Sequence, residues 1–262
     1  DELLRFSLER RVEEIRKAID LAHGHGAKTI SLAGTLPALT NYGYAVTRAL
    51  KAEGANAPPI ILTTGHACTV VAVVKTIWQV LAAVGADLAG IKVAVLGFGS
   101  IGQASLSLLL DKLGSPAQLI IADLETQLPH LEQALASLKA DYTGELTVLG
   151  VRGHQAPERL YEADLIIGAS SSGQVLEVER FRPGTILVDD SFPPAIDLLP
   201  AIHRMQTKAD VLLLGGGKLK VGDWQTHQFA PEIPEHILRP ILQSLGNDGM
   251  PGCRAEPLLL QQ

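Results

Sequence analysis

Two cysteines and one histidine are the side chains that could carry covalent or proton-transfer chemistry. Cys253 follows the Gly/Pro segment 249–252 and precedes Arg254, at the start of a short predicted helix, while His66 and Cys68 lie at the start of a longer one. The partial positive charge at a helix N-terminus favours the thiolate, the nucleophilic form of cysteine. His66 could act as a base, an oxyanion donor or a cofactor contact. Ordinary structural roles stay open for all three, because cysteine is often a small buried hydrophobe.

A glycine-rich turn between a predicted strand and a predicted helix has the pattern of a dinucleotide-binding fingerprint. The apolar run 91–96 leads directly into a turn with three glycines at the fingerprint spacing, and an amphipathic helical pattern follows. The first glycine permits the tight turn, the second lets backbone approach a pyrophosphate, and the third lets helix and strand pack closely. The helix N-terminus would supply N–H groups to the phosphates. The predicted cofactor-binding residues here are Gly97, Gly99, Ser100, Ile101 and Gly102.

An acidic residue ends the next predicted strand, 118–122. Asp123 stands 21 residues after Gly102 and could accept hydrogen bonds from both ribose hydroxyls of the adenosine half. It would also repel a 2′-phosphate, and none of the next three residues, 124–126, is an arginine that could welcome one. The pattern therefore favours NADH over NADPH, with an exposed loop aspartate as the plain alternative.

The order of predicted elements indicates an α/β protein, with a doubly wound parallel Rossmann sheet and a second, smaller α/β lobe. Predicted strands of the large sheet cover 91–96, 118–122, 146–149, 164–168, 184–189 and 211–214, with a helix at 128–138. Ahead of them stand helices at 3–23, 42–52 and 69–84 and strands at 29–33 and 59–64. We expect a substrate and catalytic lobe of residues 1–88 plus 222–262, and a dinucleotide-binding domain of residues 89–221. The cofactor cleft would then lie between them.

Loops at the carboxyl ends of such strands form the floor of the site in open α/β sheets. Ala169 and Ser170 follow one central strand and are predicted to lie near the nicotinamide ribose, although plain loop polarity would also explain the serines at 170–172. Asp189 and Asp190 end another strand and could hold a hydroxyl or a cation. The glycines at 215–217 could give backbone room or form a bare turn.

Composition excludes several classes. The formal net charge of −6 argues against generic nucleic-acid binding, and 47% hydrophobic with 19% charged residues indicates a globular chain. No apolar run is long enough for a membrane span, and no His/Cys/Asp spacing supports a metal site. Two cysteines do not make a disulfide framework, so we expect a reducing, cytoplasmic setting. A start at Asp1 is compatible with a piece of a larger polypeptide, and a homo-oligomer is open too.

Taken together, these segments resemble the long-chain acyl-[acyl-carrier-protein] reductases of cyanobacteria over about residues 10–262. The matching pieces run in the same order along both sequences. They are His25-Gly26, Thr63-Thr64-Gly65, Ala94-Val95-Leu96-Gly97, Ala163-Asp164 through Ala169-Ser170, Asp189 with Pro193, Gly215-Gly216, and Cys253-x-Ala255-Glu256.

The resemblance implies an aldehyde-forming reductase in which a cysteine, here Cys253, attacks an acyl thioester and a nicotinamide hydride releases the aldehyde. It also implies an acyl carrier protein or acyl-CoA as substrate, docked on basic residues such as Arg5, Arg10, Arg11 and Arg254. The chain departs from the family in three places. The family uses NADPH, whereas Asp123 favours NADH, and it has asparagine and histidine where His66 and Cys68 stand here. Preference for acyl chain length is not carried over.

Two other functions remain open from the residues. A non-covalent dehydrogenase of the shikimate or amino-acid type would need a base, His66 or Lys75, and would tolerate loss of Cys253. A non-enzymatic module would bind NAD(H) without turnover.

Overall fold

The computed structural model describes residues 5–219 and 250–260. The chain divides into two compact units, and each is described by itself. Unit 1 comprises residues 1–68 and 218–262, and unit 2 comprises residues 69–217. The first division falls about twenty residues before the predicted one at 88/89, because most of helix α5 (His66–Val84) packs on the sheet of unit 2.

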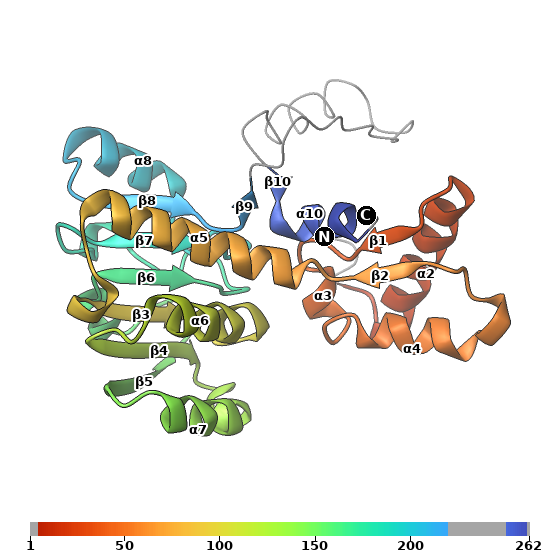
Figure 1. The fold of residues 1–262 in the computed structure, drawn as a ribbon, viewed down its shortest axis with the longest axis horizontal. Coiled ribbons are helices and arrows are strands. Elements are labelled where there is room, and N and C mark those ends of the chain that lie inside the picture. Colours follow the sequence, from red (N-terminus) through yellow and green to blue (C-terminus); the bar gives the residue numbers. More distant parts are fainter. Residues whose placement is uncertain (1–4, 220–249, 261–262) are drawn as a thin grey trace. The chain divides into compact units, whose positions relative to one another are not determined.

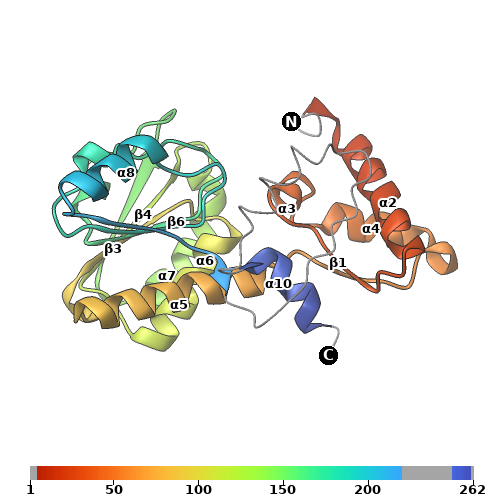
Figure 2. The same ribbon diagram turned by 90° about the horizontal axis from the view of Figure 1, so that it is seen from above.

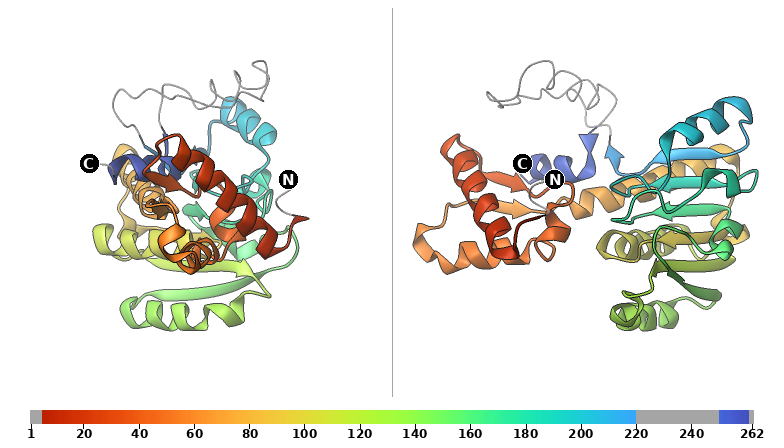
Figure 3. Two further views of the ribbon diagram at one scale, coloured as in Figure 1. Left: turned by 90° about the vertical axis from the view of Figure 1, so that its right-hand side faces the viewer. Right: turned by 180° about the vertical axis from the view of Figure 1, so that it is seen from behind.

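Unit 2 is built on a six-stranded sheet in the order β5-β4-β3-β6-β7-β8, with every pair parallel. The right-hand view of Figure 3 shows these strands running from green to blue across the sheet. Their bounds are β3 Lys92–Leu96, β4 Gln118–Leu124, β5 Glu145–Val151, β6 Leu165–Gly168, β7 Ile186–Asp189 and β8 Leu212–Gly215. The predicted doubly wound parallel fold is confirmed, and β5 is longer at both ends than the run 146–149 indicated.

Helices cover both faces of this sheet, as parallel strands require. Figure 2 shows α5 and α7 on one side and α8 on the other. The helical segments of unit 2 after α5 are η2 Leu88–Gly90, α6 Ser100–Leu113, η3 Leu128–Leu131, α7 Glu132–Asp141, η4 Glu158–Glu162, η5 Val178–Arg180 and α8 Leu198–Thr207. The predicted helix 128–138 is therefore a 3-10 turn continued by α7.

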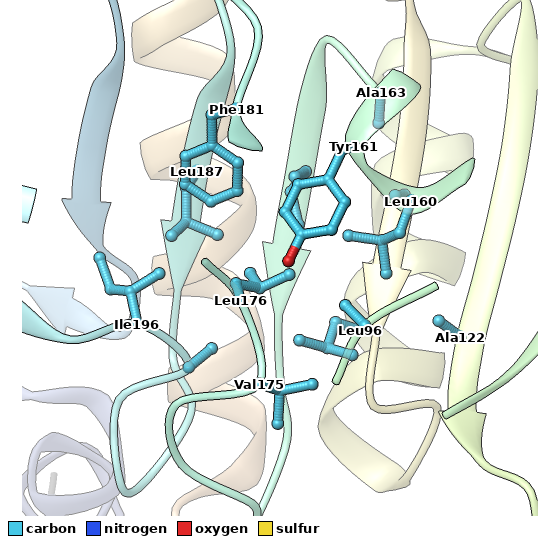
Figure 4. Close-up of a cluster of buried hydrophobic side chains, with 14 of the residues drawn as sticks. Leu96, Ala122, Leu160, Tyr161, Ala163, Val175, Leu176, Phe181, Leu187 and Ile196 are labelled. Carbon is cyan, nitrogen blue, oxygen red and sulfur yellow. The ribbon is translucent and has the colours of Figure 1, made fainter. Parts of the chain in front are cut away.

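Alternation along the strands sends side chains into two separate cores. Val93 and Val95 of β3 face a core shared with α5 and α6, whereas Ala94 and Leu96 face the opposite core. Figure 4 shows this second core, where Phe181 lies beside Leu187 and the centroids of the Tyr161 and Phe181 rings are 5.8 Å apart.

Helix α5 is long and apolar enough, by length and composition, to cross a membrane. Its residues Val73, Ile77 and Leu81 are buried against the sheet of unit 2, whereas Val71, Trp78 and Val84 on the same helix are exposed. The helix begins at His66, three residues before the predicted start, so His66 and Cys68 both lie in its first turn.

Unit 1 contains a two-stranded parallel sheet of β1 (Thr29–Ser31) and β2 (Ile61–Thr63), with helices α2 and α4 beside it (Figure 1). Its other segments are α2 Leu8–Gly24, α3 Leu36–Leu39, α4 Tyr44–Ala52, η1 Gly54–Asn56, β9 Lys218–Leu219, β10 Met250–Pro251 and α10 Gly252–Leu259. Strand β10 pairs antiparallel with β9, and α10 follows at once and packs on β1. The predicted short helix at Cys253 is confirmed, with Cys253 in its first turn.

Truncation of a side chain in the core of unit 2 should cost far more stability than the same truncation at its surface. Leu109 on α6 is 0% exposed, and Leu199 on α8 is 78% exposed. We expect Leu109→Ala to lower the free energy of unfolding by about 2–5 kcal/mol, because the cavity adds to the lost burial. Leu199→Ala should change it by less than about 0.5 kcal/mol. Urea unfolding followed by circular dichroism measures both, and similar losses in the two variants would contradict this packing.

Candidate functional site

The strand order reverses between β3 and β6, and the segments that follow these neighbouring strands pass to opposite faces of the sheet. Such a switch point is where open α/β sheets bind ligands. Gly97 ends β3 with a φ of +89°, and a Cβ there would overlap the backbone of Ala169 after β6. Only glycine fits this position, because both the backbone angle and the close approach exclude a side chain.

The three glycines of the fingerprint lie together at the start of α6. Gly99 is the N-terminal capping residue of the helix, and Ser100 and Ile101 are its first residues. Gly102 lies in the first turn, where a Cβ would overlap the carbonyl oxygen of Gly97. The turn therefore packs directly beneath the N-terminus of a helix of fourteen residues, and this cradle of bare backbone fits a pyrophosphate. The described residues contain no group of three or more His, Cys, Asp or Glu side chains that could hold a metal ion.

Asp123 is directed at the fingerprint turn by two backbone hydrogen bonds. The N–H of Phe98 donates to Oδ2 at 2.6 Å, and the N–H of Leu124 donates to Oδ1 at 2.7 Å. The carboxylate thus lies at the carboxyl end of β4 beside the glycine turn, where an acidic residue can meet the adenosine ribose of a dinucleotide. Its bond to Phe98 is a structural role that sequence spacing did not reveal.

The polar residues after β6 and β7 hold their own loops together. The Ser170 hydroxyl accepts the N–H of Ser172 at 3.0 Å, and the Ser170 N–H donates to the Ser191 hydroxyl at 2.9 Å. Asp189 accepts the N–H groups of Ser191 and Ala195 at 3.0 and 2.8 Å. Both carboxylate oxygens of Asp189 therefore anchor the loop after β7, and Ser170 has the local loop bonding that its sequence context left open.

Asp190 differs from its neighbour. Its carboxylate lies against the backbone of Gly217, in the turn after β8, where a Cβ would overlap it. Burial, helped by the negative charge of Asp189, raises the pKa of Asp190 from 3.8 to about 7. The three-glycine turn 215–217 thus gives room to a carboxyl group that titrates near neutral pH.

In unit 1, Cys253 lies against the loop between β2 and α5. A Cβ on Gly65, whose φ is +70°, would overlap the backbone of Cys253. The Ser31 hydroxyl at the end of β1 donates to the Cys253 carbonyl at 2.7 Å. The segment Thr63-Thr64-Gly65 and the cysteine, nearly two hundred residues apart in sequence, are therefore brought into direct contact.

Glu256 stabilises the contact between the Cys253 segment and the loop before α5. Its carboxylate accepts the N–H of Cys68 at 3.1 Å in the first turn of α5, and it also accepts the hydroxyl of Thr63. A carboxylate at this place satisfies an N–H that the helix itself cannot pair, and it meets the positive end of the helix dipole. Cys253 and Glu256 stand three residues apart on α10, a spacing that puts both on one side of the helix.

His66 and the two thiols have different environments. The Nδ1 atom of His66 shares a hydrogen bond with the Thr64 hydroxyl, and the ring lies edge-on to Tyr42. Burial lowers the pKa of His66, against the opposing effect of Glu256, so the imidazole is neutral near pH 7. Cys68 is only 9% exposed, and burial followed by the charge of Glu256 raises the pKa of its thiol, whereas Cys253 is half-buried.

Comparison with known protein-family models gave no match. Among solved structures, shikimate 5-dehydrogenase from Listeria monocytogenes, in complex with shikimate and NAD, matches 60% of this chain and 54% of its own, with 15% identity and a TM-score of 0.43. Quinate dehydrogenase from Corynebacterium glutamicum, in complex with NAD, matches 60% and 54%, with 16% identity and a TM-score of 0.39. L-tryptophan dehydrogenase from Nostoc punctiforme matches 67% and 53%, with 14% identity and a TM-score of 0.40. The matches span about half the length of each of these proteins.

The raised pKa of Asp190 has a consequence for stability. As pH rises from about 4 to about 7, the carboxyl ionises in the unfolded chain but stays protonated in the folded one, so the wild type loses stability. Asp190→Asn removes this loss, so the variant should be more stable than wild type at pH 8 by on the order of 2 kcal/mol. This is about half of the free energy that corresponds to the full pKa shift, because the carboxyl is only partly buried. Urea unfolding of both proteins at pH 4.5 and pH 8 measures the difference. A difference that is the same at the two pH values would contradict the prediction.

Proposed function

We propose that the chain is an NAD(P)H-dependent oxidoreductase that reduces an acyl thioester to an aldehyde through an acyl-enzyme on Cys253. The observation that carries the proposal is the attachment of the Cys-x-Ala-Glu segment to the loop 63–68, because it brings the backbone of the half-buried Cys253 against Gly65, the residue before His66.

The cofactor half of the proposal is supported by unit 2. The bare backbone of the fingerprint turn, the N-terminus of α6 and the carboxylate of Asp123 have the geometry that a dinucleotide needs. Asp123 would hold the ribose hydroxyls and disfavour a 2′-phosphate, so NADH is the proposed reductant. When bound, the dinucleotide supplies a hydride.

The nucleophile is proposed to be Cys253 rather than Cys68. A thiol attacks as its thiolate, and both the burial of Cys68 and the charge of Glu256 disfavour ionisation there. Cys253 is half-buried in the first turn of α10, where backbone N–H groups favour negative charge. Arg254, which follows it, is exposed.

The proposed reaction balances in two half-reactions. The Cys253 thiolate adds to the thioester carbonyl, the carbon–sulfur bond to the carrier breaks, and the carrier thiolate leaves and takes a proton, either the one given up by the Cys253 thiol or one from solvent. Hydride then adds to the carbonyl carbon of the acyl-enzyme, and the resulting thiohemiacetal releases the aldehyde and the Cys253 thiolate. Burial lowers the pKa of His66, which favours the neutral imidazole, so His66 could take the proton of the Cys253 thiol and pass it to the departing carrier thiolate within the first half-reaction.

The proposed substrates are acyl groups on a carrier protein or on CoA. An acidic carrier protein would dock on local basic residues, for which Arg254 beside Cys253 is the best placed in sequence. On α2, Arg10 pairs with Glu14 at 4.0 Å, and Arg11 bonds to the Leu39 carbonyl at 3.4 Å. These weak contacts leave both arginines as candidates, and Arg254, which directly follows Cys253, is the first choice for a docking test.

A non-covalent dehydrogenase is the second candidate function, and the neutral imidazole of His66 favours it. His66 could accept a proton from an alcohol or amine substrate of such an enzyme. Lys75 is the weaker base candidate, because it lies exposed on α5. This function makes Cys253 dispensable, and so does a module that only binds NAD(H).

Intact mass spectrometry separates these functions. Wild type and Cys68→Ala, mixed with an acyl-CoA or an acylated carrier protein without nucleotide, should each gain one acyl group, because the nucleophile remains. Cys253→Ala should gain none. An adduct that persists in Cys253→Ala and disappears in Cys68→Ala would show that Cys68 is the nucleophile and would overturn the assignment to Cys253. The absence of an adduct in every protein with both donors would overturn the covalent mechanism.

A further inference from the structure

An ion pair stands next to the residue proposed to hold the ribose. Strands β4 and β5 are paired in parallel, with Asp123 opposite Gly150 and Leu124 opposite Val151. The pairing continues one residue further, since the N–H of Glu125 donates to the Val151 carbonyl at 3.1 Å. Arg152 follows directly, and its Nε and Nη2 atoms donate to the two oxygens of Glu125 at 2.7 and 2.8 Å.

Strand geometry puts this pair on the same side of the sheet as Asp123. Side chains two residues apart in a strand lie on the same face of the sheet. Glu125 therefore lies on the face of Asp123, and Arg152 lies on the face of Gly150. A Cβ on Gly150 would lie 3.3 Å from the Cβ of Glu125, which places the two on one face. Because Gly150 has no side chain, Glu125 packs over it, on the face of the sheet that Gly150 shares with its strand partner Asp123.

The pair faces solvent, with 82% of the Arg152 side chain and 52% of the Glu125 side chain exposed. Such a pair adds little to stability, which leaves its position without an explanation from folding alone. The pair nevertheless occupies Arg152. The Nε and Nη2 groups that donate to Glu125 are the same donors that a guanidinium would use to bind a phosphate. The bond to Arg152 lowers the pKa of Glu125, so the pair stays charged well below neutral pH.

We propose that Glu125 is a second determinant of dinucleotide selectivity: it occupies Arg152 and so withholds it from the 2′-phosphate of NADPH. The inference rests on the proposed function, because it concerns the cofactor named there. No arginine directly follows Asp123 in the sequence, yet the register of β5 against β4 supplies one that lies 27 residues beyond Glu125 along the chain. Asp123 would repel the phosphate directly, and Glu125 would remove the cation that could compensate.

A matched pair of ligands tests the proposal without turnover. ADP-ribose and its 2′-phosphorylated form differ only in the phosphate at issue, and titration calorimetry gives a Kd for each. Wild type should prefer ADP-ribose. Glu125→Gln should shift the ratio of the two Kd values about tenfold toward the phosphorylated ligand, the worth of one charge-assisted contact. Asp123→Ser with Glu125→Gln should shift it further, and adding Arg152→Ala should abolish the part due to Glu125→Gln.

A control variant separates this local effect from net charge. Glu158→Gln removes one exposed carboxylate that pairs with Arg180 elsewhere in unit 2, and it should leave the ratio unchanged. An equal shift in Glu158→Gln, or no shift in a Glu125→Gln protein that still binds ADP-ribose, would overturn the inference alone. Failure of ADP-ribose to bind wild type would overturn the cofactor half of the proposed function together with the inference. Acylation of Cys253 is measured without nucleotide and stays independent of both.

Discussion

The carboxylate of Glu256 is the interaction on which the cysteine site depends. It joins α10 to the start of α5 by accepting the Cys68 N–H and the Thr63 hydroxyl, and the contact of Cys253 with Gly65 forms beside it. The same charge opposes the fall in the pKa of His66 and contributes to the rise in the pKa of Cys68. One side chain therefore helps to place the nucleophile candidate and to hold the neighbouring thiol in its unreactive form.

The proposed dinucleotide site of unit 2 depends on close backbone approach at the switch point. Gly97 lies against the backbone of Ala169, and Gly102 lies against the backbone of Gly97, with no room for a Cβ at either glycine. The fingerprint is therefore first a packing requirement of β3, α6 and the loop after β6. The proposed phosphate binding would use the backbone N–H groups at the N-terminus of α6. The hydrogen bond from Phe98 to Asp123 then fixes the carboxylate at the edge of the turn.

Local patterns predicted the strands of the large sheet and the fingerprint, because alternation, glycine spacing and helix periodicity are written in consecutive residues. They missed what depends on strand register or on distant segments. Arg152 reaches Glu125 only because β5 lies beside β4, and Glu256 reaches Cys68 only because α10 packs near β2. The spacing of Cys253 and Glu256 was the available sequence signal for the contact of Glu256 with Cys68. It indicates that Cys253 and Glu256 share one side of a helix, but it does not identify Cys68 as the residue that Glu256 contacts. The predicted boundary at 221/222 lies outside the described residues, whereas the division of the chain falls at 217/218, and α10 of the C-terminal segment packs on β1 in unit 1.

The most direct test of the account is a single turnover of isolated acyl-enzyme. Wild type is acylated by a thioester, freed of the donor, and mixed with NADH that carries deuterium at the transferable position. The account predicts loss of the acyl group from Cys253 together with an aldehyde that bears one deuterium at its carbonyl carbon, in an amount equal to the NADH oxidised. Release of the acyl group as the free acid, with NADH unchanged, would contradict it.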